Sequence, residues 1–187
     1  RWPGAATAPR GRISAAEYTS TRTRSLLEKS AALNMQFLFI FANSVFAANN
    51  IDEVKYPIFA SLKYHETNVR TGPSINYPIK WIFQGNNIPL EIQAKYNNWL
   101  KIKDFKGDIG WIHLTLVSQS RNLIVKNKNS VLYRKPGHNA IAEYLVDDNV
   151  RGTILSCRNS WCEVNMNGIV GWLKKNNIWG VYDYENF

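Results

Sequence analysis

Cysteine and histidine are scarce in this chain, which has two Cys and three His among 187 residues. Two Cys are too few for a dense disulfide scaffold, and they cannot supply a zinc site without further ligands. No His has a second His, Cys or carboxylate at metal-ligand spacing, and no phosphate loop, G-x-S-x-G or paired-carboxylate motif is present. We therefore expect no metal, no cofactor and no enzymatic activity.

Glycine, proline and charged residues are present at ordinary or low levels. The 11 Gly and 7 Pro are near average usage, which excludes a collagen-like or linker-rich chain. Charged residues make up 20% of the chain and apolar residues 45%, which suits one or two globular domains. The formal net charge of +9 favours acidic partners or anionic surfaces.

The basic excess is concentrated at the N-terminus. Residues 1–34 carry six Lys and Arg against two Glu, a net charge of +4, and show no apolar periodicity. We expect a disordered or spurious extension here, although an Arg-rich, acid-poor stretch is also the composition of an organelle transit peptide.

Residues 35–47 have the pattern of a signal peptide. An apolar run at 37–41 lies within the uncharged stretch 30–51, and Val45 and Ala47 occupy the −3 and −1 positions of a cleavage site. The run is too short to cross ~30 Å of hydrocarbon, so no stable membrane span is expected unless the leader stays uncleaved. No Lys or Arg lies between Met35 and the run, which keeps an uncleaved anchor and a buried helix as alternatives. Cleavage after Ala47 would leave 17 Lys and Arg against 12 Asp and Glu, a net +5, and we expect an exported, periplasmic or envelope protein.

The remainder of the chain repeats itself. Five pairs of residues are separated by 61 to 63 positions: Asn87 and Asn149, Ile92 and Ile154, Trp99 and Trp161, Gly110 and Gly171, and Pro73 and Pro136. A repeated register of this kind is evidence of duplicated units. It predicts two small tandem domains, at 58–118 and 119–184.

Each unit has the sequence pattern of short strands. Apolar and polar residues alternate at 88–94, 99–103 and 150–155, the periodicity of strands with one buried face. Polar or Gly-containing turns separate these runs, and no long helical periodicity follows residue 52. This predicts an all-β fold of two tandem small barrels. Because such small domains bury little surface, we expect four tryptophans to form the structural core: Trp99, Trp111, Trp161 and Trp172. Gly110 and Gly171 indicate a bulge or a close backbone approach.

The two Cys fall within one predicted hairpin. Cys157 and Cys162 flank a four-residue turn segment, and cross-strand Cα distances fall in the range that a disulfide tolerates. Together with the expected export, this predicts a Cys157–Cys162 disulfide, with two buried thiols as the alternative. The C-terminal aromatics, among them Trp179 and Tyr182, are expected to close the second barrel or to dock between the two barrels.

Three motifs resemble those of bacterial SH3-like (SH3b) domains. Residues 68–74 (NVRTGPS) are similar to the family's N-V-R-x-G-P-S opening, and 99–102 (WLKI) and 110–112 (GWI) are similar to its W-x-K-V and G-W-V segments. The second unit is degenerate in the opening motif at 130–136 and retains both Trp segments. The resemblance covers about 125 residues and is closest to exported, two-unit SH3-like proteins of alphaproteobacteria. It implies five-stranded SH3-like barrels and a binding module directed at the cell wall or at protein partners.

Several aromatic and basic residues of the first unit are not required by the repeat. We interpret Tyr64, Arg70, Tyr77, Trp81 and Tyr96 as candidate ligand-binding residues for peptidoglycan or an envelope peptide, although Arg70 also fits a role in bracing its own loop. The alternatives are scattered surface rings and a protein–protein scaffold without cell-wall affinity. Nucleic acid is not an expected partner, because the leader and the modest charge of the remaining chain argue against it.

Overall fold

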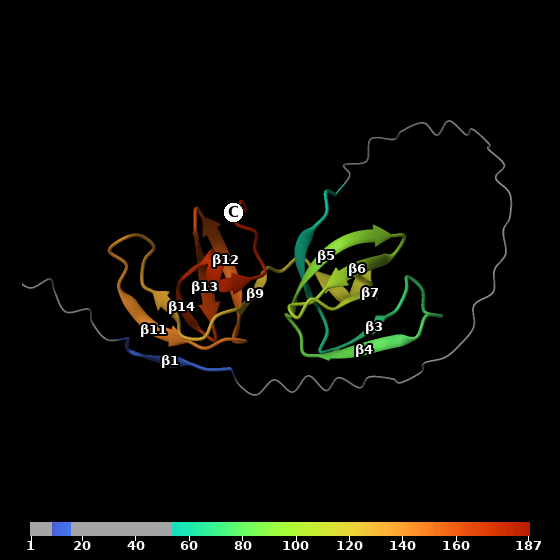
Figure 1. Ribbon diagram of the computed structural model, residues 1–187, viewed down its shortest axis with the longest axis horizontal. Coiled ribbons are helices and arrows are strands. Elements are labelled where there is room, and N and C mark those ends of the chain that lie inside the picture. Colours follow the sequence, from blue (N-terminus) through green and yellow to red (C-terminus); the bar gives the residue numbers. More distant parts are fainter. Residues whose placement is uncertain (1–8, 16–53) are drawn as a thin grey trace, which may run out of the picture.

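The structure is a computed structural model that describes residues 9–15 and 54–187. The leader expected at 35–47 lies outside the described residues. Two β-barrels lie side by side in Figure 1, and within the described residues the helical content is limited to two short 3-10 turns, at Leu114–Leu116 and Lys175–Asn177. No described helix is long and apolar enough to cross a membrane.

The first barrel is one seven-stranded antiparallel sheet with the order β4-β3-β7-β6-β5-β2-β8. Its strands are β2 (Ile58–Leu62), β3 (Glu66–Arg70), β4 (Ile79–Gln84), β5 (Pro89–Tyr96), β6 (Trp99–Lys103), β7 (Ile109–His113) and β8 (Val117–Ser118).

The second barrel repeats this topology with the order β11-β10-β14-β13-β12-β9-β15. Its strands are β9 (Asn122–Val125), β10 (Ser130–Tyr133), β11 (Ala142–Val146), β12 (Arg151–Arg158), β13 (Trp161–Met166), β14 (Ile169–Lys174) and β15 (Ile178–Trp179). The expected all-β fold with two tandem SH3-like barrels is confirmed, although each unit contributes seven strands to its sheet where the resemblance implies five.

The duplication extends to the irregular positions. A register shift follows Ile92 in the first barrel and Ile154 in the second, each in the long strand of its unit. Asn97 and Asn159, 62 residues apart, both take left-handed backbone at φ 49° and 50° in the turns that follow. Asn tolerates this conformation better than most residues, so the two turns preserve the register of both hairpins.

Each barrel has its own apolar core, built by period-two alternation. In β6 the side chains of Leu100 and Ile102 are buried, whereas Trp99, Lys101 and Lys103 alternate with them and are half-exposed. The first core is centred on Leu62, Leu90, Ile92, Ile102 and Ile112, and the second on Leu123, Val125, Leu132, Val146 and Leu173.

The alternation corrects the expectation for the four tryptophans. Trp172 is 7% exposed and belongs to the buried set, with the Arg158 guanidinium 4.5 Å from its ring centroid. Trp99, Trp111 and Trp161 are half-buried, because the aliphatic residues next to them take the inward positions. The barrel interior is therefore filled mainly by Leu, Ile and Val, and three of the four rings lie at the surface.

The expected close approach at the repeated Gly is confirmed. A Cβ atom on Gly171 would lie 2.7 Å from Leu132 Cγ and 3.0 Å from the Tyr133 carbonyl oxygen. Gly110 meets Val69 and the Arg70 carbonyl oxygen in the same way. Strands β7 and β14 can therefore approach β3 and β10 only where a side chain is absent.

One strand comes from the N-terminal stretch that sequence analysis assigns to a disordered or spurious extension. Strand β1 (Gly11–Ile13) pairs in parallel with β11 at the outer edge of the second sheet, and Ile13 is 8% exposed within the second core. Figure 1 shows β1 running along β11.

The C-terminal residues contact both barrels. They close the second barrel through β15 (Ile178–Trp179) and also dock between the two barrels, the two alternatives that the sequence leaves open. The ring of Phe59 in the first barrel lies 5.0 Å from Trp179 and 4.6 Å from Tyr182, centroid to centroid. At the end of the chain, Phe187 exchanges two backbone hydrogen bonds with Cys157 at 2.7 and 3.0 Å.

Candidate functional site

The five candidate ligand-binding residues do not form one site. Tyr64, Tyr77 and Tyr96 are 47%, 46% and 58% exposed, but they lie on different segments of the first barrel. Trp81 is 4% exposed and packs edge-to-face against Phe83 at 5.9 Å in the first core, so its assignment to ligand binding is wrong. Its position in β4 faces inward by the same alternation that turns Trp99 outward.

Arg70 braces its own loop. Its guanidinium donates to the carbonyl oxygen of Tyr77 at 2.8 Å, across the segment 71–77. The Tyr77 ring lies over Gly72, where a Cβ would be 2.6 Å from the ring carbons. The G-P turn of the opening motif therefore has a packing role, because only Gly leaves room for this ring.

A groove on the second barrel gathers aromatic and basic side chains from three segments. It has a volume of about 850 Å³ and lies between the β10–β11 loop, the β12–β13 turn and the 3-10 turn Lys175–Asn177. Tyr133 and His138 line the first side, Asn159 and Trp161 the second, and Lys174 the third.

The aromatic pair in this groove is held in a fixed arrangement. Trp161 and Tyr133 meet edge-to-face, with centroids 5.2 Å apart. Lys174 Nζ lies 5.5 Å from the Trp161 ring centroid, because Trp161 and Lys174 are directly paired across β13 and β14. An aromatic face beside a cation and amide groups is suited to a polymer that carries both sugar rings and carboxylates.

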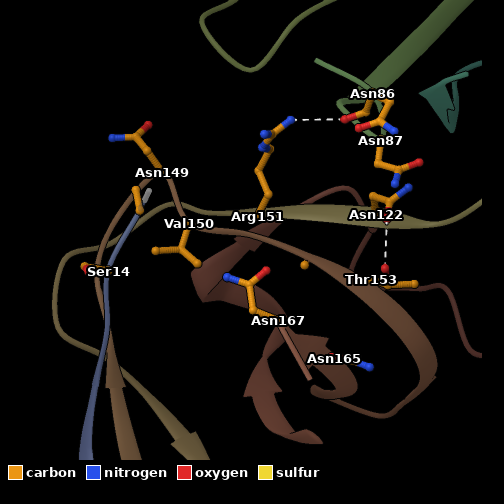
Figure 2. A pocket seen from close by; sticks show the side chains of 12 residues that line it. Ser14, Asn86, Asn87, Asn122, Asn149, Val150, Arg151, Thr153, Asn165 and Asn167 are labelled. Atoms are coloured by element: carbon orange, nitrogen blue, oxygen red, sulfur yellow. Dashed lines mark hydrogen bonds between the residues drawn. The ribbon is translucent and has the colours of Figure 1, made fainter. Parts of the chain in front are cut away.

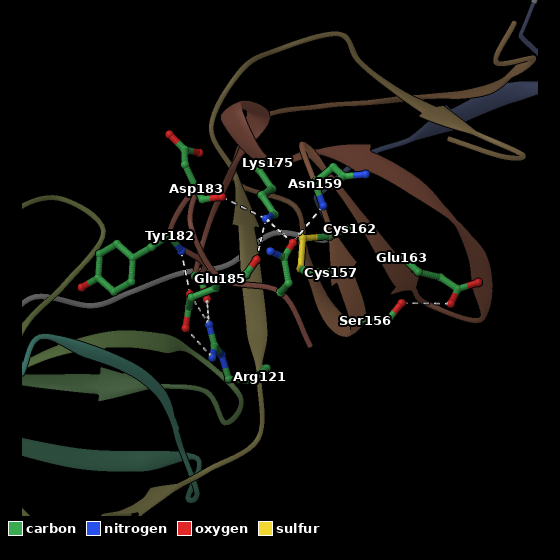
Figure 3. The surroundings of a disulfide bond; sticks show 12 residues. Arg121, Ser156, Cys157, Asn159, Cys162, Glu163, Lys175, Tyr182, Asp183 and Glu185 are labelled. Atoms are coloured by element: carbon green, nitrogen blue, oxygen red, sulfur yellow. Dashed lines mark hydrogen bonds and ion pairs between the residues drawn. A yellow bond between two sulfur atoms is a disulfide. The ribbon is translucent and has the colours of Figure 1, made fainter. Parts of the chain in front are cut away.

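The wall of the groove is reinforced by a buried lysine. Lys175 is 3% exposed, and its ammonium donates to the carbonyl oxygens of Asp183, at 3.1 Å, and Glu185. Arg121 binds the Glu185 carboxylate through two hydrogen bonds of 2.9 Å. Figure 3 shows these residues converging on the C-terminal segment, which fixes Asp183 at the groove.

The disulfide predicted from the hairpin is confirmed. Cys157 and Cys162 are direct cross-strand partners with Cα atoms 4.1 Å apart, and both are almost fully buried. The bridge closes the hairpin whose turn forms one side of the groove (Figure 3).

The first barrel has a related but different surface at the equivalent place. Trp99 corresponds to Trp161 and meets His113 edge-to-face at 5.5 Å. The position of Tyr133 is taken by Arg70, since both pair with the second Trp of their unit. The aromatic pair is therefore a property of the second barrel.

A second cleft opens between the barrels and is lined mainly by amides. It receives Asn86 and Asn87 from the first barrel and four asparagines from the second, namely Asn122, Asn149, Asn165 and Asn167. Arg151 spans it and donates to the Asn86 carbonyl oxygen at 3.1 Å, as Figure 2 shows. Asn122 accepts from Thr153 at 3.1 Å, and its Nδ2 has no hydrogen-bond partner in the described part of the chain.

A polar contact joins the two barrels next to the Phe59 cluster. Tyr182 donates to Glu91 Oε1 at 2.7 Å, and Lys103 Nζ lies 2.6 Å from Glu91 Oε2. Burial alone would raise the pKa of Glu91, but the hydrogen bonds from Lys103 and Tyr182 outweigh it and hold that pKa below its usual value. Burial, and then the bond to Glu91, raise the pKa of Tyr182, so the phenol keeps its proton.

The described residues, 9–15 and 54–187, contain no group of three or more His, Cys, Asp or Glu side chains that could hold a metal ion. Sequence reasoning missed Tyr133 and Lys174, since it sought ligand residues in the first unit. The alternation of apolar and polar residues in the second repeat contains a signal for this groove, because it places Trp161 on the outer face of β13, opposite Lys174.

Comparisons with known proteins agree with the duplicated fold. The family model described as "Bacterial SH3 domain" matches residues 63–119 and 126–180. Two similar solved structures are NlpC2 and NlpC1 from Trichomonas vaginalis, each at 12% identity, with TM-scores of 0.32 and 0.31. They cover 71% and 68% of this chain, which spans about half of their length, 51% and 47%. No curated protein is significantly similar. Because the family model matches more than half of the residues, in two copies, the chain belongs to the bacterial SH3 domain family.

Proposed function

We propose that this protein is a non-catalytic, exported binding module whose second barrel holds peptidoglycan in the groove around Trp161. The observation that carries the proposal is the pair of bacterial SH3 domains, since domains of this family commonly bind cell-wall peptidoglycan. The groove supplies the matching chemistry, with an aromatic pair, an exposed lysine and amide groups within one cleft.

Each part of the groove has a counterpart in a sugar–peptide polymer. The Trp161 and Tyr133 rings offer apolar surface to the faces of sugar rings. Lys174 is exposed and offers its charge to a peptide carboxylate. Because Trp161 and Tyr133 already contact each other, ligand binding does not have to order them, which lowers the entropic cost.

Retention of the full chain on purified, insoluble peptidoglycan tests the proposal. We expect Trp161→Ala to reduce retention at least tenfold, and Trp161→Phe to reduce it less, because it keeps an aromatic ring. Lys174→Ala should weaken retention, whereas Lys128→Ala, which removes the same charge from an exposed turn, should not.

An equal loss of retention in Lys174→Ala and Lys128→Ala would mean that retention depends only on net charge, and it would contradict a specific site in the groove. No retention above an unrelated basic protein would contradict wall binding altogether. The alternative function, a scaffold for envelope proteins without wall affinity, predicts instead that cross-linking recovers one protein partner and no glycan.

A further inference from the structure

The outer edge of β11, away from the groove, is paired with a strand from the N-terminal part of the chain. In the second barrel this edge is filled by β1, which is more than 120 residues away in the sequence. The backbone contact is continuous, since Arg10 N–H donates to the Glu143 carbonyl and the Asp147 N–H donates to the Ile13 carbonyl at 3.0 Å. The pairing of β1 with β11 does not depend on the peptidoglycan proposal.

The side chains of the docked segment are matched in charge by the edge. Arg12 forms an ion pair with Asp147 and donates to Asn129 Oδ1 at 3.0 Å. Arg10 lies 3.7 Å from Glu143, whose carboxylate is also bound by Arg134 at 2.9 Å. Two carboxylates thus face the two guanidinium groups of the docked segment, that of Arg10 just before β1 and that of Arg12 at its middle residue.

An apolar anchor completes the contact. Ile13 is 8% exposed and joins the core cluster that contains Val146 and Leu132. Gly11 lies opposite Tyr144 in the register, with ordinary van der Waals spacing to its ring. The segment that pairs with the edge, residues 10–13, is therefore an extended chain with the order basic, small, basic, aliphatic.

The first barrel provides an internal comparison. Its equivalent edge strand is β4. Val69 in β3 pairs with Trp81, and Leu132 at the equivalent position of β10 pairs with Tyr144, so Trp81 is the counterpart of Tyr144. On that register Lys80 replaces Glu143 and Gln84 replaces Asp147. The β4 edge lacks both carboxylates, and no described strand pairs with its outer side.

We propose that the outer edge of β11 is a strand-acceptor site for an extended peptide of the pattern Arg-x-Arg-aliphatic, and that residues 10–13 occupy it in cis. Main-chain hydrogen bonds to a sheet edge supply affinity in this mode of recognition, and the flanking side chains supply specificity. Displacement of residues 10–13, or their removal by the cleavage after Ala47 that the sequence predicts, would open the same edge to a peptide of this chemistry from another protein.

The test uses the full chain with its own strand unseated. Ile13→Asp places a carboxylate in the apolar position beside Val146. Arg12→Glu, a change at the surface, serves as a second variant that leaves the core intact. Hydrogen exchange of the Asp147 amide reports occupancy, because this amide donates to Ile13. We expect exchange to be at least tenfold faster in both variants than in the wild type.

A fluorescent synthetic peptide with the sequence of residues 9–15 is then added. We expect it to bind the Ile13→Asp chain at least tenfold more tightly than the wild type, whose edge is filled, and to restore protection of the Asp147 amide. Adding Asp147→Lys should weaken this binding at least tenfold, whereas Asp148→Lys, the same charge change on the next residue, should weaken it far less.

Unchanged protection of the Asp147 amide in both variants would overturn the assigned seating of β1. Rapid exchange without peptide binding would overturn the acceptor site, and equal weakening by Asp147→Lys and Asp148→Lys would overturn its charge specificity.

Discussion

At the scale of single residues, the repeated Gly-Trp pairs determine how tightly each barrel closes. Gly110 and Gly171 stand where β7 and β14 cross close to β3 and β10, and in both places the neighbouring atoms are a core side chain and a backbone carbonyl. A backbone carbonyl in a sheet cannot move aside as the end of a flexible side chain can. The absence of a side chain is therefore a requirement of the fold at both positions.

We expect Gly171→Ala to destabilise the second barrel by about 1–3 kcal/mol, the usual cost of overpacking. The new methyl group would lie 2.7 Å from Leu132 Cγ and 3.0 Å from the Tyr133 carbonyl oxygen. Urea unfolding of the full chain measures the change. Gly11→Ala is the control, since its Cβ would lie 3.5 Å from the Tyr144 ring, and it should change stability by less than about 0.5 kcal/mol. Equal stability of the two variants would contradict the crowding argument.

The disulfide acts on the same scale in the second barrel. Its loop is short, with a sequence separation of 5, so the loop-entropy model gives a stabilisation of about 2 kcal/mol. We expect a reductant to lower the unfolding free energy of the wild type by about this amount. The double variant Cys157→Ala/Cys162→Ala should be insensitive to reductant, and a wild type with the same insensitivity would contradict a formed bridge.

At the scale of elements, period-two alternation predicts which residues form strands better than it predicts which of them face inward. The runs at 99–103 and 150–155 were expected as strands, and β6 and β12 occupy them. The large Trp rings do not mark the inward face of these strands, although a large apolar ring is usually expected inside. In β6 and β13 the inward positions belong to Leu100, Ile102, Cys162 and Val164, and the Trp at the start of each strand lies outside.

The second element-scale feature is the contact between β5 and the C-terminal segment. The Tyr182 phenol and the Lys103 ammonium both bind the Glu91 carboxylate, and Phe59 packs beside them. The sequence predicts a packing role for the aromatic residues at this end of the chain, but it gives no signal for Glu91, because a contact between residues 91 positions apart leaves no local pattern.

We expect Tyr182→Phe to weaken the contact by about 1–3 kcal/mol, because a hydrogen bond to a buried carboxylate is lost while the ring stays. The pKa of Glu91 is lower in the folded protein than its ordinary value of 4.5, so its contribution is complete above that pH and is lost as the pH falls through the folded pKa. The acid-induced loss of stability below pH 4.5 should therefore be smaller in Glu91→Gln than in the wild type.

Urea unfolding at pH 7 and at successive pH values below 4.5 measures both effects. Lys106→Ala, at an exposed site in the turn after β6, is the control for a change of charge near this region. An acid dependence that is identical in the wild type and Glu91→Gln would contradict the assignment of the lowered pKa to this contact.

At the scale of the whole molecule, the two barrels share one topology and differ at their surfaces. Both barrels share strand order, bulges and turn residues, which explains why a spacing of about 62 in the sequence predicted two units. They differ at the surface: the second barrel alone has Tyr133 beside its Trp, the Cys157–Cys162 bridge, and carboxylates at its outer edge. None of these features of the second barrel coincides with the family's opening motif, which matches better in the first barrel.

The comparison of the two barrels also shows that the family's opening motif has a structural role in the first barrel and does not mark the position of the groove. In the first barrel the opening motif holds a loop, through the Arg70 bond to Tyr77 and the packing of Tyr77 on Gly72. The degenerate second copy gives up this arrangement and places Tyr133 in the groove instead. A site formed by loops and turns from three parts of the barrel depends on their spatial arrangement, so motif strength along the sequence did not indicate its position.

Peptidoglycan binding in the groove of the second barrel can be followed through the indole N–H resonances of the full chain during titration with soluble peptidoglycan fragments. Trp161→Phe assigns the Trp161 resonance. We expect this resonance to shift in a saturable way, while that of Trp81, which is buried in the first core, does not move. Saturable binding that leaves the Trp161 resonance unchanged, or no shift of any indole at millimolar fragment, would contradict it.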